Sequence, residues 1–95
     1  MLREFWQGHS DAEASLRMWI RLVRAARWLS LVDLRRTFPG ADQVVVGSGR
    51  LVVVFNIAHN RFRLIAAVHY NRHIVYTLRL LAHKEYDRGA WKEQL

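Results

Sequence analysis

Four apolar segments in the second half of the chain constrain its fold most strongly. They span residues 44–46, 51–57, 62–70 and 74–81, and they are rich in β-branched and aromatic side chains. Short turns containing Gly, Ser, Asn or Arg separate them. Such segments are typical of β-strands joined by hairpins. We therefore expect a four-stranded, mainly antiparallel sheet.

The residues before Pro39-Gly40 carry helical patterns instead. A capping-box pattern begins at Ser10 and ends three residues later at Glu13. Apolar residues then recur at helical spacing, which predicts a first helix over residues 11–27. Ser30 opens a second, shorter helix that Pro39-Gly40 ends. With a short C-terminal helix after the last strand, the pattern predicts an α+β fold.

The connection between the last two strands decides which residues share a face. A three-residue loop at 71–73 places one apolar row on one face: Leu64, Ala66, Val68, Tyr70, Ile74, Tyr76, Leu78 and Leu80. A two-residue loop sets the first half of that row against His73, Val75, Thr77 and Arg79 instead. Because a one-residue slip exchanges the faces of a strand, burial favours the first register. The opposite face then carries Arg63, His69, Thr77 and Arg79, with His83 just beyond the strand.

Positive charge dominates the second half of the chain. The formal net charge is +7, and no Asp or Glu occurs between Asp42 and Glu85. That interval carries Arg50, Arg61, Arg63, Arg72, Arg79 and Lys84. A surface of one sign attracts a polyanion, which favours nucleic acid over an acidic protein partner. Arg17, Arg21 and Arg24 form a further row on the first helix, which is either a solvated face or an RNA contact.

Several other classes of protein are disfavoured. The 95 residues suffice for a single domain with a modest core, and the absence of Cys excludes disulfides and thiolate chemistry. No apolar run is long enough to span a bilayer, so a cytoplasmic protein is expected. His69 and His73 have the spacing of helical zinc ligands but lie in a predicted hairpin, so neither a metal nor another cofactor is expected.

Arg, His, Lys and Tyr residues cluster near the ends of the last two predicted strands. RNA cleavage without a metal needs such side chains, to activate the 2′-hydroxyl, to protonate the leaving 5′-oxygen and to stabilise charge on the phosphate. Arg63 is the expected phosphate ligand, the alternative being a surface salt bridge. His83 is expected to transfer protons, unless it only fixes the turn after the strand. Tyr86 either positions the phosphate or packs as a core aromatic.

The stretch from Trp28 to Trp91 resembles the HigB toxins of bacterial toxin–antitoxin pairs, a branch of the RelE-like superfamily. The resemblance rests on an ordered set of short matches: Asp33-Leu34, Phe38-Pro39, Ala41-Asp42, Val54-Phe55-Asn56-Ile57, Asn60 with Arg61 and Arg63, and His83 with Glu85-Tyr86-Asp87. It implies a small α+β fold that cuts messenger RNA, usually on the ribosome. It also implies a HigA-type antitoxin as partner.

We therefore predict Arg63, His83 and Tyr86 as catalytic residues, and RNA contacts at Asn60, Arg61, Arg79 and Lys84. The chain departs from the family pattern twice. Leu78 stands where the family usually has Arg, with Arg79 one position later, and Ala82 precedes the His where Thr is usual. One position along a strand changes the face of a side chain unless a bulge restores it. Relative to the position of the family Arg, Arg79 therefore reaches the same face only if a bulge restores it.

Two functions remain open from the sequence. The first is an endoribonuclease toxin that leaves a 2′,3′-cyclic or 3′ phosphate. The second is a non-catalytic RNA- or ribosome-binding module with the same fold. The basic surface serves both, and the Arg, His and Tyr set favours the nuclease.

Overall fold

The computed structural model describes residues 2–95, with side chains from residue 4 onward. Its elements are α1 (Leu2–Gly8), a 3₁₀ turn (Ser10–Ala12), α2 (Glu13–Ala25), α3 (Leu31–Thr37), β1 (Asp42–Val45), β2 (Leu51–Ile57), β3 (Phe62–His69), a second 3₁₀ turn (Tyr70–Arg72), β4 (Ile74–Ala82), α4 (His83–Arg88) and α5 (Ala90–Gln94). The strands form one antiparallel sheet in the order β1-β2-β3-β4. The predicted α+β fold is confirmed. No helix of the described part combines the length and the apolar character that a membrane span requires.

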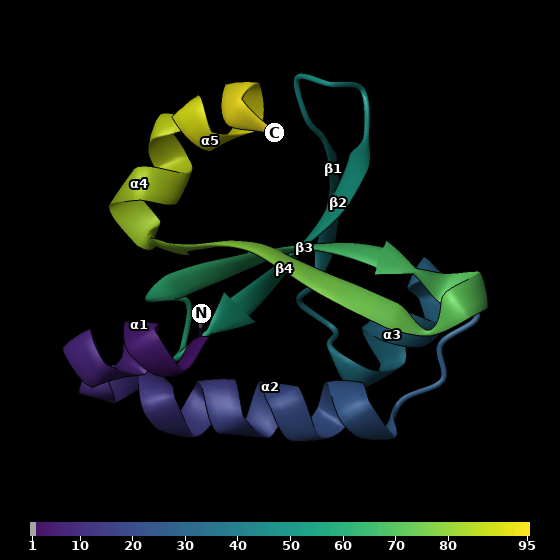
Figure 1. Ribbon diagram of the computed structural model, residues 1–95, viewed down its shortest axis with the longest axis horizontal. Helices are drawn as coiled ribbons and strands as arrows, with labels where there is room; N and C mark the ends of the chain where they lie inside the picture. The colour runs from purple at the N-terminus through teal and green to yellow at the C-terminus, as the bar shows by residue number, and fades with distance from the viewer. Residues whose placement is uncertain (1) are drawn as a thin grey trace.

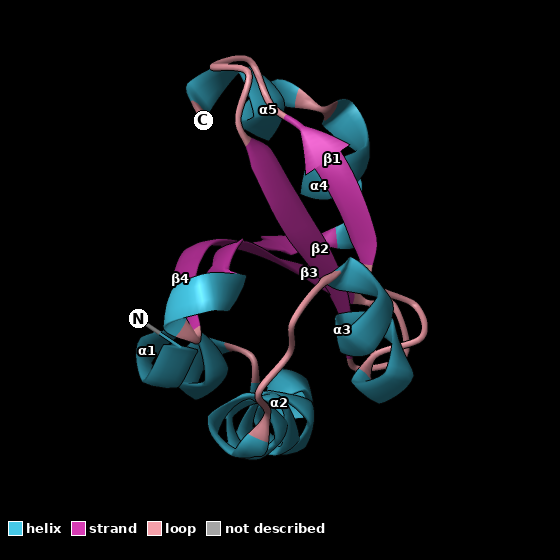
Figure 2. Ribbon diagram, turned by 90° about the vertical axis from the view of Figure 1, so that its right-hand side faces the viewer, coloured by secondary structure: helices cyan, strands magenta, loops and turns pink. Residues whose placement is uncertain are grey.

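The sheet lies between two groups of helices. Figure 1 shows α1 and α2 on one side of the sheet and α4 and α5 on the other. The view turned by a quarter shows the same layers, with α3 beside α2 (Figure 2). Each side has its own cluster of buried side chains. Strand β2 is accordingly almost continuously buried, because alternate residues enter different cores.

The larger core joins α2 and α3 to the sheet. Leu16 from α2, Leu34 from α3 and Leu64 from β3 are fully buried in it. The ring of Phe55 lies at its centre, edge-on to Trp19 at 5.4 Å and to Phe38 at 5.0 Å between ring centroids. Aromatic pairs prefer this edge-to-face geometry. The periodic apolar residues of the first predicted helix therefore do face the core.

The expected helix boundaries need three corrections. The chain has an additional helix, α1, whose Phe5 and Trp6 pack against the larger core. The predicted capping box at Ser10 is wrong, because a 3₁₀ turn begins there and α2 starts at Glu13 without a side-chain cap. That helix ends at Ala25, two residues early. By contrast, Ser30 caps α3 as predicted, since its hydroxyl accepts a hydrogen bond from the Asp33 N–H.

The predicted register of the last hairpin is only half right. Between the bulge and the far end of the hairpin, Leu64 pairs with Leu80 as expected. Near the turn, Ala66 pairs with Thr77 and Val68 pairs with Val75, which is the register that we disfavoured. A bulge at Leu78 joins the two registers, because the pairing steps from Ile65–Arg79 to Ala66–Thr77.

The bulge changes the faces of several residues. Val75, not Tyr76 or Ile74, packs against the larger core, and Thr77 shares the face of buried Ala66 instead of the polar face. Tyr76 is half exposed, with its ring edge-on to His69 at 5.4 Å between centroids. A turn of four residues, of which Tyr70 was assigned to a strand, makes this register possible.

The position of Leu64 in the larger core gives a direct test of this architecture. Leu64→Ala should lower the free energy of unfolding by about 2–5 kcal/mol, because it removes fully buried methyl groups and leaves a cavity. Leu51→Ala makes the same chemical change on β2 at a side chain that is 54% exposed, and it should cost less than about 1 kcal/mol. Urea denaturation measures both. Equal losses would contradict the burial of Leu64 and the exposure of Leu51.

Candidate functional site

The candidate site is built around contacts between Arg63 of β3 and Tyr86 of α4. The guanidinium carbon of Arg63 lies 5.4 Å from the centre of the Tyr86 ring. The Arg63 Nη1 also donates hydrogen bonds to the carbonyl oxygens of Asn60, at 2.6 Å, and Phe62, at 3.3 Å. These contacts fix a cation at the start of β3, beside the start of α4. The predicted alternative of a surface salt bridge does not occur, since no carboxylate pairs with Arg63 in the described part of the chain.

The turn before β3 has an unusual backbone. Ala58, His59 and Asn60 all have positive φ, at 54°, 54° and 70°. Residues other than glycine rarely adopt this conformation, and it costs conformational energy at each position. The turn brings the Asn60 carbonyl to the Arg63 guanidinium. Strained backbone thus holds a candidate phosphate ligand in place.

Tyr86 packs in the smaller core and also lies near charged groups. Its half-buried ring stacks on Trp91 at 5.4 Å between centroids, and the Trp91 Nε1 donates to the Tyr86 carbonyl oxygen at 3.0 Å. Burial raises the pKa of the Tyr86 phenol; Arg63 opposes this rise, and the Asp42 and Asp87 carboxylates add to it. The phenol therefore stays protonated at neutral pH and can donate a hydrogen bond.

His83 is the first residue of α4. Its N–H donates to the Arg61 carbonyl oxygen at 3.0 Å, which ties the start of the helix to the start of β3. The His83 Nδ1 lies 3.0 Å from an Asp87 carboxylate oxygen. A carboxylate at Nδ1 orients an imidazole and leaves Nε2 to exchange protons. Asp87 was not predicted as a site residue, although its spacing of four from His83 on a helix indicates such a pair.

The β4 bulge decides the position of Arg79. Arg79 pairs with Ile65, whose side chain belongs to the smaller core together with Tyr86. Paired residues of neighbouring strands share a face, so Arg79 lies on the same face as Arg63. Without the extra residue, Leu78, the register near the turn would place Arg79 against the larger core. The bulge that the prediction required is therefore present.

The remaining predicted residues lie around this cluster. Arg61 forms an ion pair with Asp11 at 3.2 Å, and Lys84 is exposed on the first turn of α4. The structure joins Arg63 to Tyr86 and Asn60, and it joins His83 to Arg61 through the backbone. Among the described residues, no hydrogen bond or ion pair connects Arg79 or Lys84 to the others; Arg79 donates to the adjacent Leu78 carbonyl at 2.8 Å.

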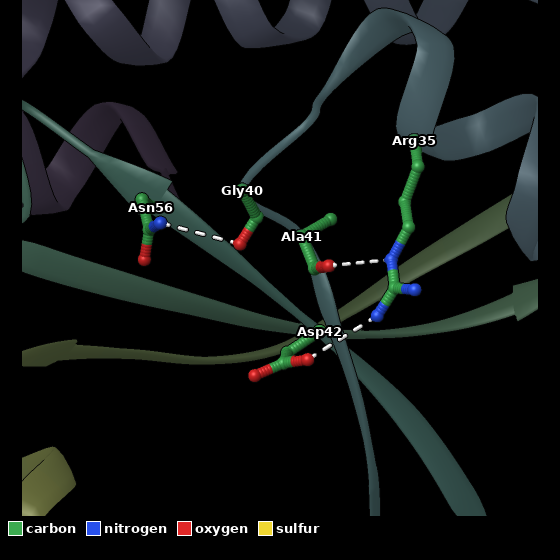
Figure 3. A network of polar contacts seen from close by, with 5 residues as sticks. All are labelled: Arg35, Gly40, Ala41, Asp42 and Asn56. Carbon is green, nitrogen blue, oxygen red and sulfur yellow. Dashed lines mark hydrogen bonds and ion pairs between the residues drawn. The ribbon is translucent and has the colours of Figure 1, made fainter.

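A polar network that joins α3, the loop before β1, β1 and β2 borders the site and was missed from the sequence (Figure 3). Arg35 donates to the Ala41 carbonyl oxygen at 3.0 Å and pairs with Asp42 at 3.3 Å. The Asn56 amide donates to the Gly40 carbonyl oxygen at 3.3 Å. A Cβ at Gly40 would lie 2.7 Å from the Asn56 amide nitrogen, so a larger residue there would displace this amide.

This network is continuous with the cluster. Asn56 is the strand partner of Arg63, and the charge of Asp42 acts on the Tyr86 phenol. Both residues belong to short motifs of the resemblance, and Asn56 interrupts an apolar strand. That interruption was the signal that could have identified it. Among the described residues, no group of three His, Asp or Glu side chains is arranged to hold a metal ion.

The electrostatic environment of Tyr86 can be tested by titration. Arg63→Gln should raise the phenol pKa of Tyr86 further, because it removes the cation that favours the phenolate, and Asp42→Asn should lower it. NMR of the tyrosine ring carbons against pH measures each phenol separately. Tyr70 is the internal control, because burial alone raises its pKa. A Tyr86 pKa that is the same in both variants and in the unaltered chain would contradict the described geometry.

The comparison with known proteins shows the family to which this chain belongs. No curated protein matches the chain. A family model described as HigB toxin, the RelE-like toxic component of a toxin–antitoxin system, matches residues 12–89. The matched range includes the whole sheet, α4, and both residues of the central contact, Arg63 and Tyr86. The chain therefore belongs to the HigB toxin family of RelE-like toxic components of toxin–antitoxin systems.

Proposed function

We propose that this chain is an endoribonuclease that cuts messenger RNA, on the ribosome and without a metal, in the cytoplasm. We further propose that residues 1–95 form a single toxin domain, which a HigA-type antitoxin neutralises. Membership of the family makes the chain a toxin with an antitoxin partner. The main support for the nuclease is the position of the Arg63 guanidinium over the Tyr86 ring. The helix that contains Tyr86 also contains the His83–Asp87 pair.

Arg63 is the proposed ligand of the scissile phosphate. A guanidinium binds two phosphate oxygens and stabilises the charge that grows during attack. Its contact with the Asn60 carbonyl and the Tyr86 ring orients it before RNA binds. Such preorganisation lowers the barrier, because the protein does not have to rearrange in the transition state. Arg79, on the same face, adds a second positive charge.

His83 is the proposed general base. With Nδ1 facing Asp87, its Nε2 takes the proton of the 2′-hydroxyl as the 2′-oxygen attacks phosphorus. The bond between phosphorus and the 5′-oxygen then breaks and leaves a 2′,3′-cyclic phosphate. Tyr86, which is protonated at neutral pH, gives its proton to the departing 5′-oxygen, and the proton that His83 has taken up returns to the phenolate through solvent. Asn60, Arg61 and Lys84 bind neighbouring phosphates or bases of the RNA.

A non-catalytic RNA- or ribosome-binding module remains the second candidate. The packing of Tyr86 favours it, because the ring stacks on Trp91 in the smaller core and so has a role without any chemistry. The His83–Asp87 pair favours the nuclease, since two exposed residues on a short helix add little to stability.

Substitutions in the cluster separate these candidates. Arg63→Ala, His83→Ala and Tyr86→Phe should each slow cleavage of ribosome-bound messenger RNA, Arg63→Ala by roughly 10²-fold or more. The double variant of His83 and Tyr86 should be far from additive, because both residues act in one step. Gel analysis of RNA ends measures cleavage, and ribosome co-sedimentation measures binding. Arg50→Ala, at an exposed turn, is the matched control and should cut normally.

Two results would reject the mechanism. Cleavage that both His83→Ala and Tyr86→Phe leave unchanged removes these residues from it. Ribosome binding without cleavage by the unaltered protein, with several messages, selects the non-catalytic module.

The proposed partner predicts a growth phenotype. Induction of this chain alone should arrest bacterial growth, and co-expression of a HigA-like protein encoded beside it should restore growth. The Arg63→Ala chain, induced to the same level, should be harmless. Normal growth at high soluble expression of the unaltered chain would contradict the proposal.

A further inference from the structure

A second basic surface lies on the other side of the sheet from the Arg63–Tyr86 cluster. Here α1 and α2 enclose an open groove of about 600 Å³. Its lining consists of Trp6, Arg17, Ile20, Arg21, Arg24 and Ala25. Figure 1 shows both helices beneath the sheet, whereas α4 lies above it. A ligand in this groove is therefore separated from the candidate site by the sheet.

The arginines of the groove differ in how they are held. The Arg17 guanidinium lies over the Trp6 ring at 4.8 Å, and its Nε donates to the Glu13 carboxylate at 2.8 Å. Both contacts orient Arg17 along the groove. Arg21 and Arg24 are exposed, and neither forms an ion pair within the described residues. Among the described residues, Arg21 and Arg24 therefore have no ion-pair partner, whereas Arg17 is held in place.

We propose that this groove binds the phosphate backbone of RNA, separately from the cleavage site. The inference rests on the proposed function, since it assigns the groove to the same class of ligand. Residues 17, 21 and 24 follow one another at roughly one turn along α2, so the groove presents a line of positive charge. The lining contains no carboxylate among the described residues, and the Glu13 carboxylate beside it pairs with Arg17, which leaves Arg21 and Arg24 to supply the charge. A linear polyanion matches such a line and gains affinity by releasing counterions.

The distribution of apolar side chains favours RNA over an acidic protein segment. Protein interfaces have an apolar, often aromatic centre. The large apolar side chains that the described surface exposes lie elsewhere: Met18, Leu29, Val32, Val45, Leu51 and Tyr76. Nucleic-acid interfaces are more polar and more positively charged, and half of the residues that line this groove are arginines, beside Trp6 and Ile20. Trp6 belongs to α1, which precedes the matched residues 12–89, so the groove is completed by a segment outside the family match.

The test measures RNA binding without cleavage. A fluorescent 2′-O-methyl RNA hairpin lacks the 2′-hydroxyl nucleophile, so its anisotropy reports binding whether or not the chain is a nuclease. The double variant Arg21→Gln and Arg24→Gln should bind it about tenfold more weakly at low salt. The slope of log affinity against log salt should fall by about 1 to 2. The control, Arg50→Gln with Arg72→Gln, removes the same charge from exposed turns and should change neither quantity appreciably.

Three outcomes overturn the proposal. Equal losses in the two double variants show that net charge alone binds RNA. Unchanged affinity in the groove variant shows that RNA does not use the groove. Unchanged RNA affinity combined with lost binding of an octaglutamate peptide assigns the groove to an acidic protein segment. Cleavage of ribosome-bound messenger RNA by a saturating excess of the groove variant should match that of the unaltered chain, so the failure of the nuclease and the failure of the groove give different results.

Discussion

The burial of β3 on both faces is the constraint on which the other features depend. Leu64 and Ala66 enter the core beneath the sheet, and Ile65, between them, enters the core above it. A strand in this position cannot slip by one residue, because every side chain would exchange cores. Arg63 follows the same alternation, and so its guanidinium is directed to the side of α4. The site is thus positioned by packing that has no chemical role of its own.

The C-terminal helices illustrate how packing and chemistry are combined. Tyr86 and Trp91 close the smaller core, while Arg63 covers the Tyr86 ring from the sheet. The same contacts that attach α4 to the sheet therefore assemble the candidate site. His83 and Asp87 lie on the exposed part of this helix and depend on its attachment for their position.

Much of the fold could be predicted from the sequence because local patterns determine it. Strand β2 was predicted with its observed bounds, since a short apolar run that is rich in β-branched residues and lies between two turns is typical of a buried strand. The hairpin register could not be predicted, because the bulge at Leu78 depends on packing against both cores at once. Helix α1 was not predicted, because its seven residues are too few to show a helical repeat of apolar side chains. For the site, residue types suggested Arg63, His83 and Tyr86. The spacing of Asp87 from His83 and the interruption of an apolar strand by Asn56 were local signals, whereas the action of Asp42 on Tyr86 could be seen only in the fold.

The turn at residues 58–60 sets a limit on how this protein can change. Three successive residues with left-handed backbone lower the stability of the chain, and glycine there would relieve the strain. Glycine would also loosen the Asn60 carbonyl that holds Arg63. Variants selected for thermostability alone would therefore tend to replace these residues and leave the Arg63 guanidinium less fixed. The turn thus lowers the stability of the fold and in return fixes the guanidinium.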